Sequence, residues 1–67
     1  MMSKTAHFKV FCLEQYKNEH HMKGKDAFDL FKSYGVFGYL DSFYDVLHTF
    51  GAKHIVQDID LFIEARR

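Results

Sequence analysis

Proline is absent from this chain of 67 residues, and cysteine occurs once, at Cys12. A lone cysteine excludes an internal disulfide and a zinc site built on several cysteines, and it suits a reducing compartment. We therefore expect a cytoplasmic protein. Without proline, the four glycines at positions 24, 35, 38 and 51 are the main turn signals, and they divide the chain into segments of helical length.

Net charge is also absent, because nine basic and nine acidic residues cancel. Proteins that bind nucleic acid usually carry a basic excess, so this balance weighs against that class. The charges are spread unevenly, however: residues 41–64 contain five acids against Lys53 alone. We interpret the acidic second half as a candidate surface for a partner, and a mixed, solvated surface is the alternative.

Long hydrophobic runs are missing as well. The N-terminal stretch is interrupted by His7 and Lys9 and is typical of neither a signal peptide nor a membrane span. Aromatic residues, in contrast, are plentiful, with eight Phe and four Tyr. A domain of this size buries only about 60 % of its unfolded surface. We therefore expect some apolar surface to remain for a protein partner or for a second copy of the chain.

Hydrophobic spacing predicts an all-α fold, a compact bundle of four short helices with glycine turns, in one domain over residues 1–67. The expected helices are residues 3–20, 25–34, 37–49 and 52–65. Ser3 or Thr5 suits the N-cap of the first helix, and Gly35 and Gly51 suit the positions that close the second and third. The last segment is also rich in β-branched residues, as strands are, but a single strand would have no partner. The predicted core comprises Phe11, Cys12, Leu30, Phe31, Leu40, Phe43, Leu47, Ile55, Ile59 and Phe62.

A phenol, a carboxylate and an imidazole lie close together at Tyr44, Asp45 and His48. A carboxylate that orients an imidazole is the arrangement used in acid–base catalysis. No nucleophile accompanies the three groups, and one helix does not form a cleft. We therefore interpret His48 as the end of a helix, where its charge suits the helix dipole, and we predict no catalytic residue.

Metal and cofactor sites are not predicted either. His20 and His21 are adjacent and would point about 100° apart on a helix, and the chain has no HxxxH or Cys/His spacing. Cys12 falls in the apolar stripe of the first helix and is interpreted as a core residue rather than a reactive thiol. The glycines of GVFG lack the Lys and Ser/Thr of a phosphate-binding loop.

Several runs in the chain carry a family resemblance. These are an apolar Cys-Leu-Glu helix, Lys-Gly-Lys, Tyr-Gly-Val, and Tyr-x-Val-Leu-His-Thr-x-Gly over residues 44–51. Together they resemble an uncharacterised family of short bacterial proteins, a domain of unknown function, over about residues 8–63. The resemblance implies a gene neighbourhood with an ADP-ribosyltransferase-like protein, in an arrangement similar to a toxin and its antidote. It implies no catalytic residue.

The leading interpretation is a non-enzymatic helical protein-binding module, an antitoxin-like or accessory partner of an ADP-ribosyltransferase-like enzyme. In this hypothesis an acidic, aromatic face of the last two helices covers a basic cleft in the partner. Two alternatives stay open, a small DNA-binding regulator and a self-assembling structural module. The residues expected on the binding face are Asp41, Asp45, Asp58, Asp60, Glu64, Tyr39 and Phe50.

Overall fold

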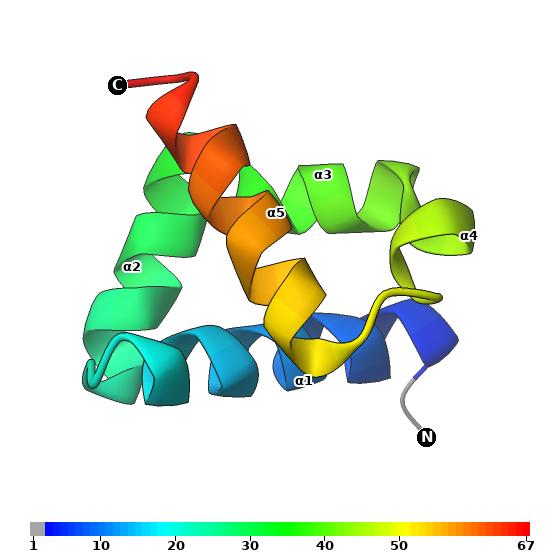
Figure 1. The fold of residues 1–67 in the computed structure, drawn as a ribbon, viewed down its shortest axis with the longest axis horizontal. Coiled ribbons are helices and arrows are strands. Elements are labelled where there is room, and N and C mark those ends of the chain that lie inside the picture. The colour runs from blue at the N-terminus through cyan, green and yellow to red at the C-terminus, as the bar shows by residue number, and fades with distance from the viewer. Residues whose placement is uncertain (1–2) are drawn as a thin grey trace.

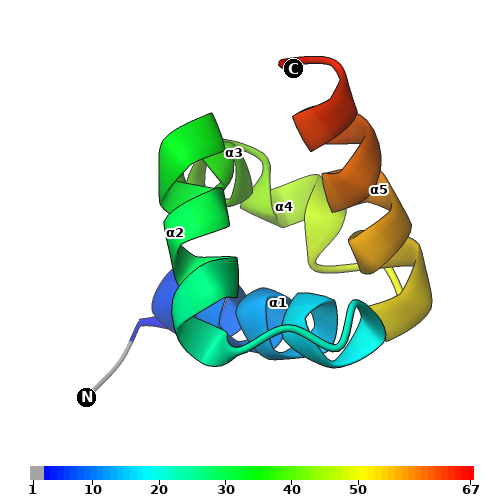
Figure 2. The same ribbon diagram turned by 90° about the vertical axis from the view of Figure 1, so that its left-hand side faces the viewer.

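The computed structural model describes residues 3–67, and this part of the chain contains five helices and no strand. They are α1 (Lys4–Glu19), α2 (Gly24–Tyr34), α3 (Val36–Ser42), α4 (Tyr44–Leu47) and α5 (Ala52–Glu64). α1 forms the base, α2 and α5 rise from it, and α3 spans the far side (Figure 1). Turned by 90°, the molecule shows α2 and α5 on opposite sides above α1 (Figure 2). The all-α prediction is confirmed, including the helical last segment.

Two helix ends follow the local chemistry of the sequence. Ser3 is the N-cap of α1, and its hydroxyl accepts a hydrogen bond from the backbone N–H of Ala6 at 3.1 Å. Gly35 follows α2 with φ 72° and ψ 25°, the left-handed conformation that glycine adopts without steric cost. Because α3 begins at the next residue, this single glycine makes the whole turn between α2 and α3.

The third predicted helix, residues 37–49, is wrong as a single element. It breaks at Phe43, whose φ of −115° and ψ of 23° lie outside the helical range, so that α3 and α4 are separate helices. In an unbroken helix Leu40, Phe43 and Leu47 would share one face. The break keeps Leu40 and Leu47 buried and turns Phe43 outward, where it is 54 % exposed.

Gly51 also differs from the prediction. It does not close a helix in the left-handed conformation, because its φ is −70° and its ψ is 164°. It is instead the N-cap of α5, in extended backbone that any residue adopts. After α4 the backbone N–H and the hydroxyl of Thr49 both donate to the carbonyl of Val46, at 3.3 and 2.7 Å, and the N–H of Phe50 donates to the carbonyl of Leu47 at 3.0 Å.

The core lies between α1, α2, α3 and α5. Of the ten residues predicted for it, six are buried: Cys12, Phe31, Leu40, Leu47, Ile55 and Ile59. Leu30 and Phe62 are half-buried. The assignments of Phe11 and Phe43 to the core are wrong, because these side chains are 41 % and 54 % exposed. The remaining core residues are Tyr16, Ala27, Val36, Val56 and Ile63. No polar or charged residue among residues 3–67 is buried, so apolar packing alone fills the interior.

The helices are short and mixed in polarity. Within residues 3–67, none has both the length and the apolar character needed to cross a membrane.

Candidate protein-binding groove

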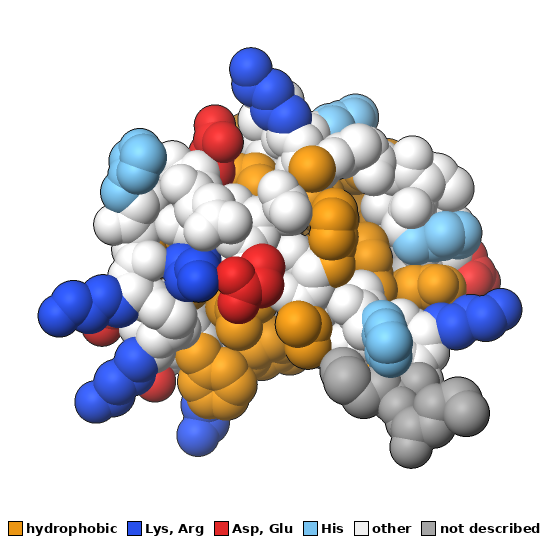
Figure 3. Space-filling model, turned by 90° about the horizontal axis from the view of Figure 1, so that it is seen from below, with side chains coloured by type: hydrophobic (Ala, Val, Ile, Leu, Met, Phe, Trp, Pro, Cys, Tyr) orange, Lys and Arg blue, Asp and Glu red, His pale blue; other side chains and the backbone are white. Residues whose placement is uncertain are grey.

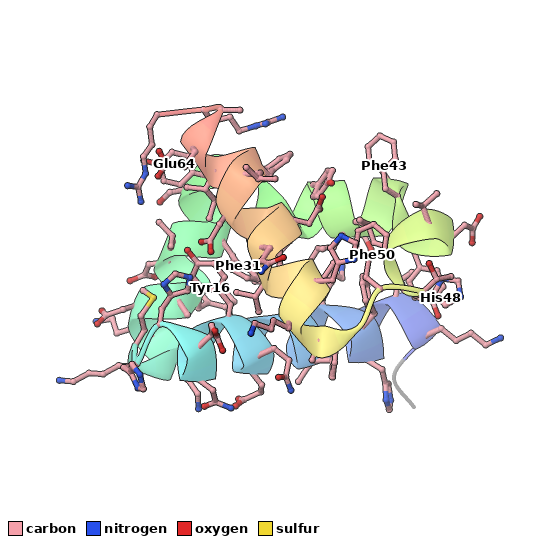
Figure 4. All side chains as sticks on the ribbon, viewed as in Figure 1. Tyr16, Phe31, Phe43, His48, Phe50 and Glu64 are labelled. Atoms are coloured by element: carbon pink, nitrogen blue, oxygen red, sulfur yellow. The ribbon has the colours of Figure 1, made fainter. Side chains whose placement is uncertain are left out.

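An open groove of about 300 Å³ lies where α3 faces the C-terminal part of α5. The end of α2 borders it on a third side. Its lining combines aromatic rings, small residues and one arginine: Tyr34, Gly35, Gly38, Tyr39, Ser42, Phe43, Phe62 and Arg66. Figure 4 shows Phe43 projecting away from the helices beyond α3, whereas Tyr16 and Phe31 point into the space that the helices enclose.

Stacked aromatic rings form the wall of the groove. The rings of Tyr39 and Phe62 stack with their centroids 4.1 Å apart, and Phe43 meets Tyr39 at 5.4 Å. The phenol of Tyr39 donates a 2.7 Å hydrogen bond to the carboxylate of Asp58 on α5. Burial, reinforced by this carboxylate, raises the pKa of Tyr39 to about 12. The hydrogen bond to Asp58 holds the Tyr39 ring in one orientation.

Two arginines follow α5 at the end of the groove. The guanidinium of Arg66 lies over the Phe62 ring, 3.5 Å from its centroid, and donates to the Phe62 carbonyl at 3.3 Å. Arg67 lies 5.9 Å from the centroid of Tyr34 and pairs with Glu64 at 3.4 Å. Within the described residues Arg66 has no ion pair, so a positive charge at this end is left without a carboxylate.

The small residues leave space on the exposed side of α3. Gly38 and Ser42 lie one helical turn apart and are both exposed. Among residues 3–67 no other group would come within 4 Å of a Cβ atom added at Gly38. Packing within this chain therefore does not require a glycine at position 38, although an interior glycine weakens a helix by about 0.5–1 kcal/mol.

Most of the acids predicted for the binding face have partners within the chain. Asp41 pairs with Lys9 at 2.9 Å, Asp60 with His20 at 3.0 Å, and Asp58 accepts from Tyr39. These contacts join α3 to α1, α5 to the end of α1, and α5 to α3. An exposed ion pair such as Lys9–Asp41 contributes only about 0–1 kcal/mol, and the His20–Asp60 contact is an ion pair only when the imidazole is protonated. These contacts nevertheless occupy the carboxylates that a partner's basic residues would contact.

The other predicted residues are dispersed. Asp45 is exposed on α4, without an ion pair in the described structure, and Glu64 is exposed and paired with Arg67. Phe50 is half-buried, and its ring stacks on His54 with a centroid separation of 4.2 Å. Of the seven predicted residues, only Tyr39 lines the groove.

Tyr44, Asp45 and His48 do not form a catalytic arrangement in the described chain. The ring of His48 stacks on that of Tyr44 at 4.7 Å, and its Nδ1 lies 2.7 Å from the Tyr44 carbonyl oxygen. The hydrogen-bond partner of the imidazole is therefore the helix backbone and not the carboxylate of Asp45. This agrees with the interpretation of His48 as a helix end.

The next features are the possible metal ligands and the single thiol within residues 3–67. No group of three or more His, Cys, Asp or Glu side chains is placed there to hold a metal ion. Cys12 is fully buried, and burial raises the pKa of its thiol to about 12, so the reactive thiolate is disfavoured.

Sequence reasoning missed most of the groove. Phe43 and Phe62 were assigned to the core because of their spacing, and Arg66 was assigned no role. A glycine at position 38 inside a predicted helix was the available signal, since an interior glycine often indicates a packing or functional need.

Fold and groove together define a small all-α domain with an open aromatic groove. The chain belongs to the family described as "Protein of unknown function (DUF3791)", whose model matches residues 7–66. No curated protein and no solved structure matches the chain.

Proposed function

We propose that this chain is a non-enzymatic protein-binding module that engages its partner through the aromatic groove between α3 and α5. The observation that carries the proposal is the outward position of Phe43 beside the unfilled side of Gly38. The solvent exposure of the Phe43 ring costs free energy, and Gly38 is not required by packing within the chain. A partner chain that covered both residues would explain them.

The residue types favour a protein as the ligand. Aromatic residues and arginine are enriched at protein interfaces and dominate the binding energy where they are desolvated. Small-molecule sites, in contrast, are usually enclosed and contain a few convergent polar groups. This groove is open, and four of its eight lining residues are aromatic.

The first partner to test follows from the sequence resemblance. We propose an antitoxin-like or accessory role toward an ADP-ribosyltransferase-like enzyme, with both proteins in the bacterial cytoplasm. The acidic residues of α3 to α5 have a secondary role in this proposal, behind the aromatic groove. Most are paired within the chain, so we expect them to set the association rate and its salt dependence more than the affinity.

Site-specific photo-crosslinking tests whether the groove is the binding surface. A photoreactive phenylalanine analogue at position 43 should capture the ADP-ribosyltransferase-like protein expressed with the chain. The same analogue at Lys53, exposed in the first turn of α5, is the matched control, because about nine residues of helix, or some 14 Å, separate it from Phe62. Equal capture from both positions, or none from position 43, would contradict the proposal.

Self-association is a second candidate function, and exposed apolar residues on another face favour it. Val10, Phe11 and Phe28 on α1 and α2 are 50 %, 41 % and 47 % exposed. Seen from the side of α1, hydrophobic side chains appear between the charged ones (Figure 3). Sedimentation equilibrium over a wide concentration range tests this function: a dimer that Phe28→Ser disrupts would support it, and a monomer at all concentrations would exclude it.

A further inference from the structure

The charge at the C-terminal end of the groove points to the chemistry of its occupant. Resting on the proposed function, we propose that the groove takes one amphipathic helix of a partner protein, oriented by a carboxylate on that helix that binds Arg66. From the acidic composition of the second half of the chain, a basic partner surface was expected. The groove instead offers a positive charge, that of Arg66, and so favours an acidic group on the partner.

The shape of the α3 surface suits a helix. The separation of two packed helices, about 8–10 Å, depends on the side chains at their contact, and small residues allow the closest approach. Gly38 and Ser42 provide such a position in the middle of the groove, flanked by the rings of Tyr39 and Phe43. Apolar side chains spaced three or four residues apart on a partner helix would then reach both rings.

The distribution of charge selects a carboxylate. Arg66 is positioned over the Phe62 ring by its contact with the ring and by its hydrogen bond to the backbone, which restricts its remaining N–H donors before binding. Asp58 is engaged by Tyr39, and Glu64 by Arg67. A planar guanidinium binds a carboxylate through two parallel hydrogen bonds, and these are among the stronger polar contacts in proteins.

Nucleic acid fits the same surface less well. Stacked rings beside an arginine also occur in proteins that bind single strands. Asp58 and Glu64, however, place negative charge next to the Tyr39 ring and the C-terminal arginines, and a phosphate backbone would be repelled there. A helix with one acid at Arg66 brings a single negative charge to this region, so the repulsion is smaller than for a phosphate backbone with a charge at every nucleotide.

Two matched pools of displayed helical peptides provide the probe. Both pools carry randomised apolar residues at helical spacing; one has Glu or Asp at the flanking positions, and the other has Lys. Selection against the full chain should enrich the acidic pool. Arg66→Glu should weaken the selected acidic peptides by about tenfold or more, the effect of losing a charged hydrogen bond. Lys53→Glu makes the same change of charge at the opposite end of α5 and should leave their affinity unchanged.

Blocking variants separate this inference from the proposed function. Gly38→Leu and Ser42→Leu place a large side chain on exposed positions of α3, and circular dichroism shows which of them folds. Peptides that bind the parent but not the blocked chain establish the groove as a binding surface. If such peptides come equally from both pools, or are indifferent to Arg66→Glu, the acidic-helix inference is wrong while the groove remains. If neither pool yields peptides that depend on the groove, the helix inference is wrong, and crosslinking from position 43 decides separately whether the groove binds a partner protein.

Discussion

Two glycines three residues apart should respond in opposite ways to the same substitution. Gly38→Ala adds a methyl group that meets no other group within 4 Å, in the interior of a helix. Alanine is the better helix former by about 0.5–1 kcal/mol, so the variant should be more stable by that amount. For a domain of this size this corresponds to a rise in melting temperature of about 2–8 °C.

Gly35→Ala should lower the stability although its added methyl group is equally free of contacts. The reason is the backbone, because φ is 72° at this position and an L-residue there costs about 1–2 kcal/mol. The stiffer unfolded chain returns part of that cost, which leaves a loss of roughly 1 kcal/mol, or about 4–8 °C. The measurement is thermal unfolding followed by circular dichroism, with urea denaturation to check that the m-value is unchanged.

The result that refutes this reasoning is a Gly38→Ala variant that melts below the parent. Position 38 would then have a role within the chain's own fold, and the open side of α3 could no longer be attributed to a partner. A stabilised variant that binds its partner less well would show the opposite, namely that stability is given up to keep the groove open.

The remaining predictions concern the core, the helix end and the alkaline limit of stability. Ile59→Ala should lose about 2–5 kcal/mol by urea denaturation, because the side chain is fully buried, whereas Leu61→Ala, which is 71 % exposed, should lose less than about 0.5 kcal/mol. Similar losses from both would mean that the face of α5 is misassigned. His48→Gln should lose less than about 2 kcal/mol and keep partner binding, and its failure to bind would give the imidazole a functional role. Burial raises the pKa of Cys12 and of Tyr39 to about 12, above their unfolded values of 9.0 and 10.0. The stability that the two neutral groups contribute should therefore be fully present below pH 9 and be lost as the pH rises toward 12. A free energy of unfolding that stays constant across that range would contradict the assigned burial.

Local sequence patterns were sufficient to predict the helices whose ends do not depend on distant residues. α2 and α5 lie within one residue of their predicted ends, since each carries its own apolar stripe. Gly35 was predictable for the same reason: a glycine that directly follows an apolar stripe closes a helix through its own backbone. These features depend on residues within a few positions of one another.

The break at Phe43 depends on distant residues instead. The spacing of Leu40, Phe43 and Leu47 is that of one continuous helix, and nothing local ends it. In the structure Leu40 and Leu47 are buried from two different helices, and the break between them leaves Phe43 exposed. Tertiary packing therefore overrides the local periodicity at this point.

The candidate site was the least predictable part, and its charges show why. Composition indicates an acidic second half, but it does not say which acids are engaged. The structure pairs Asp41 with Lys9 and Asp60 with His20, residues 32 and 40 positions away, and leaves Arg66 on the groove without an ion pair in the described chain. Sequence by itself determined α1, α2 and α5, because their caps and backbone hydrogen bonds are local. Only the tertiary structure decided which charges and rings face outward, because that depends on which helices meet.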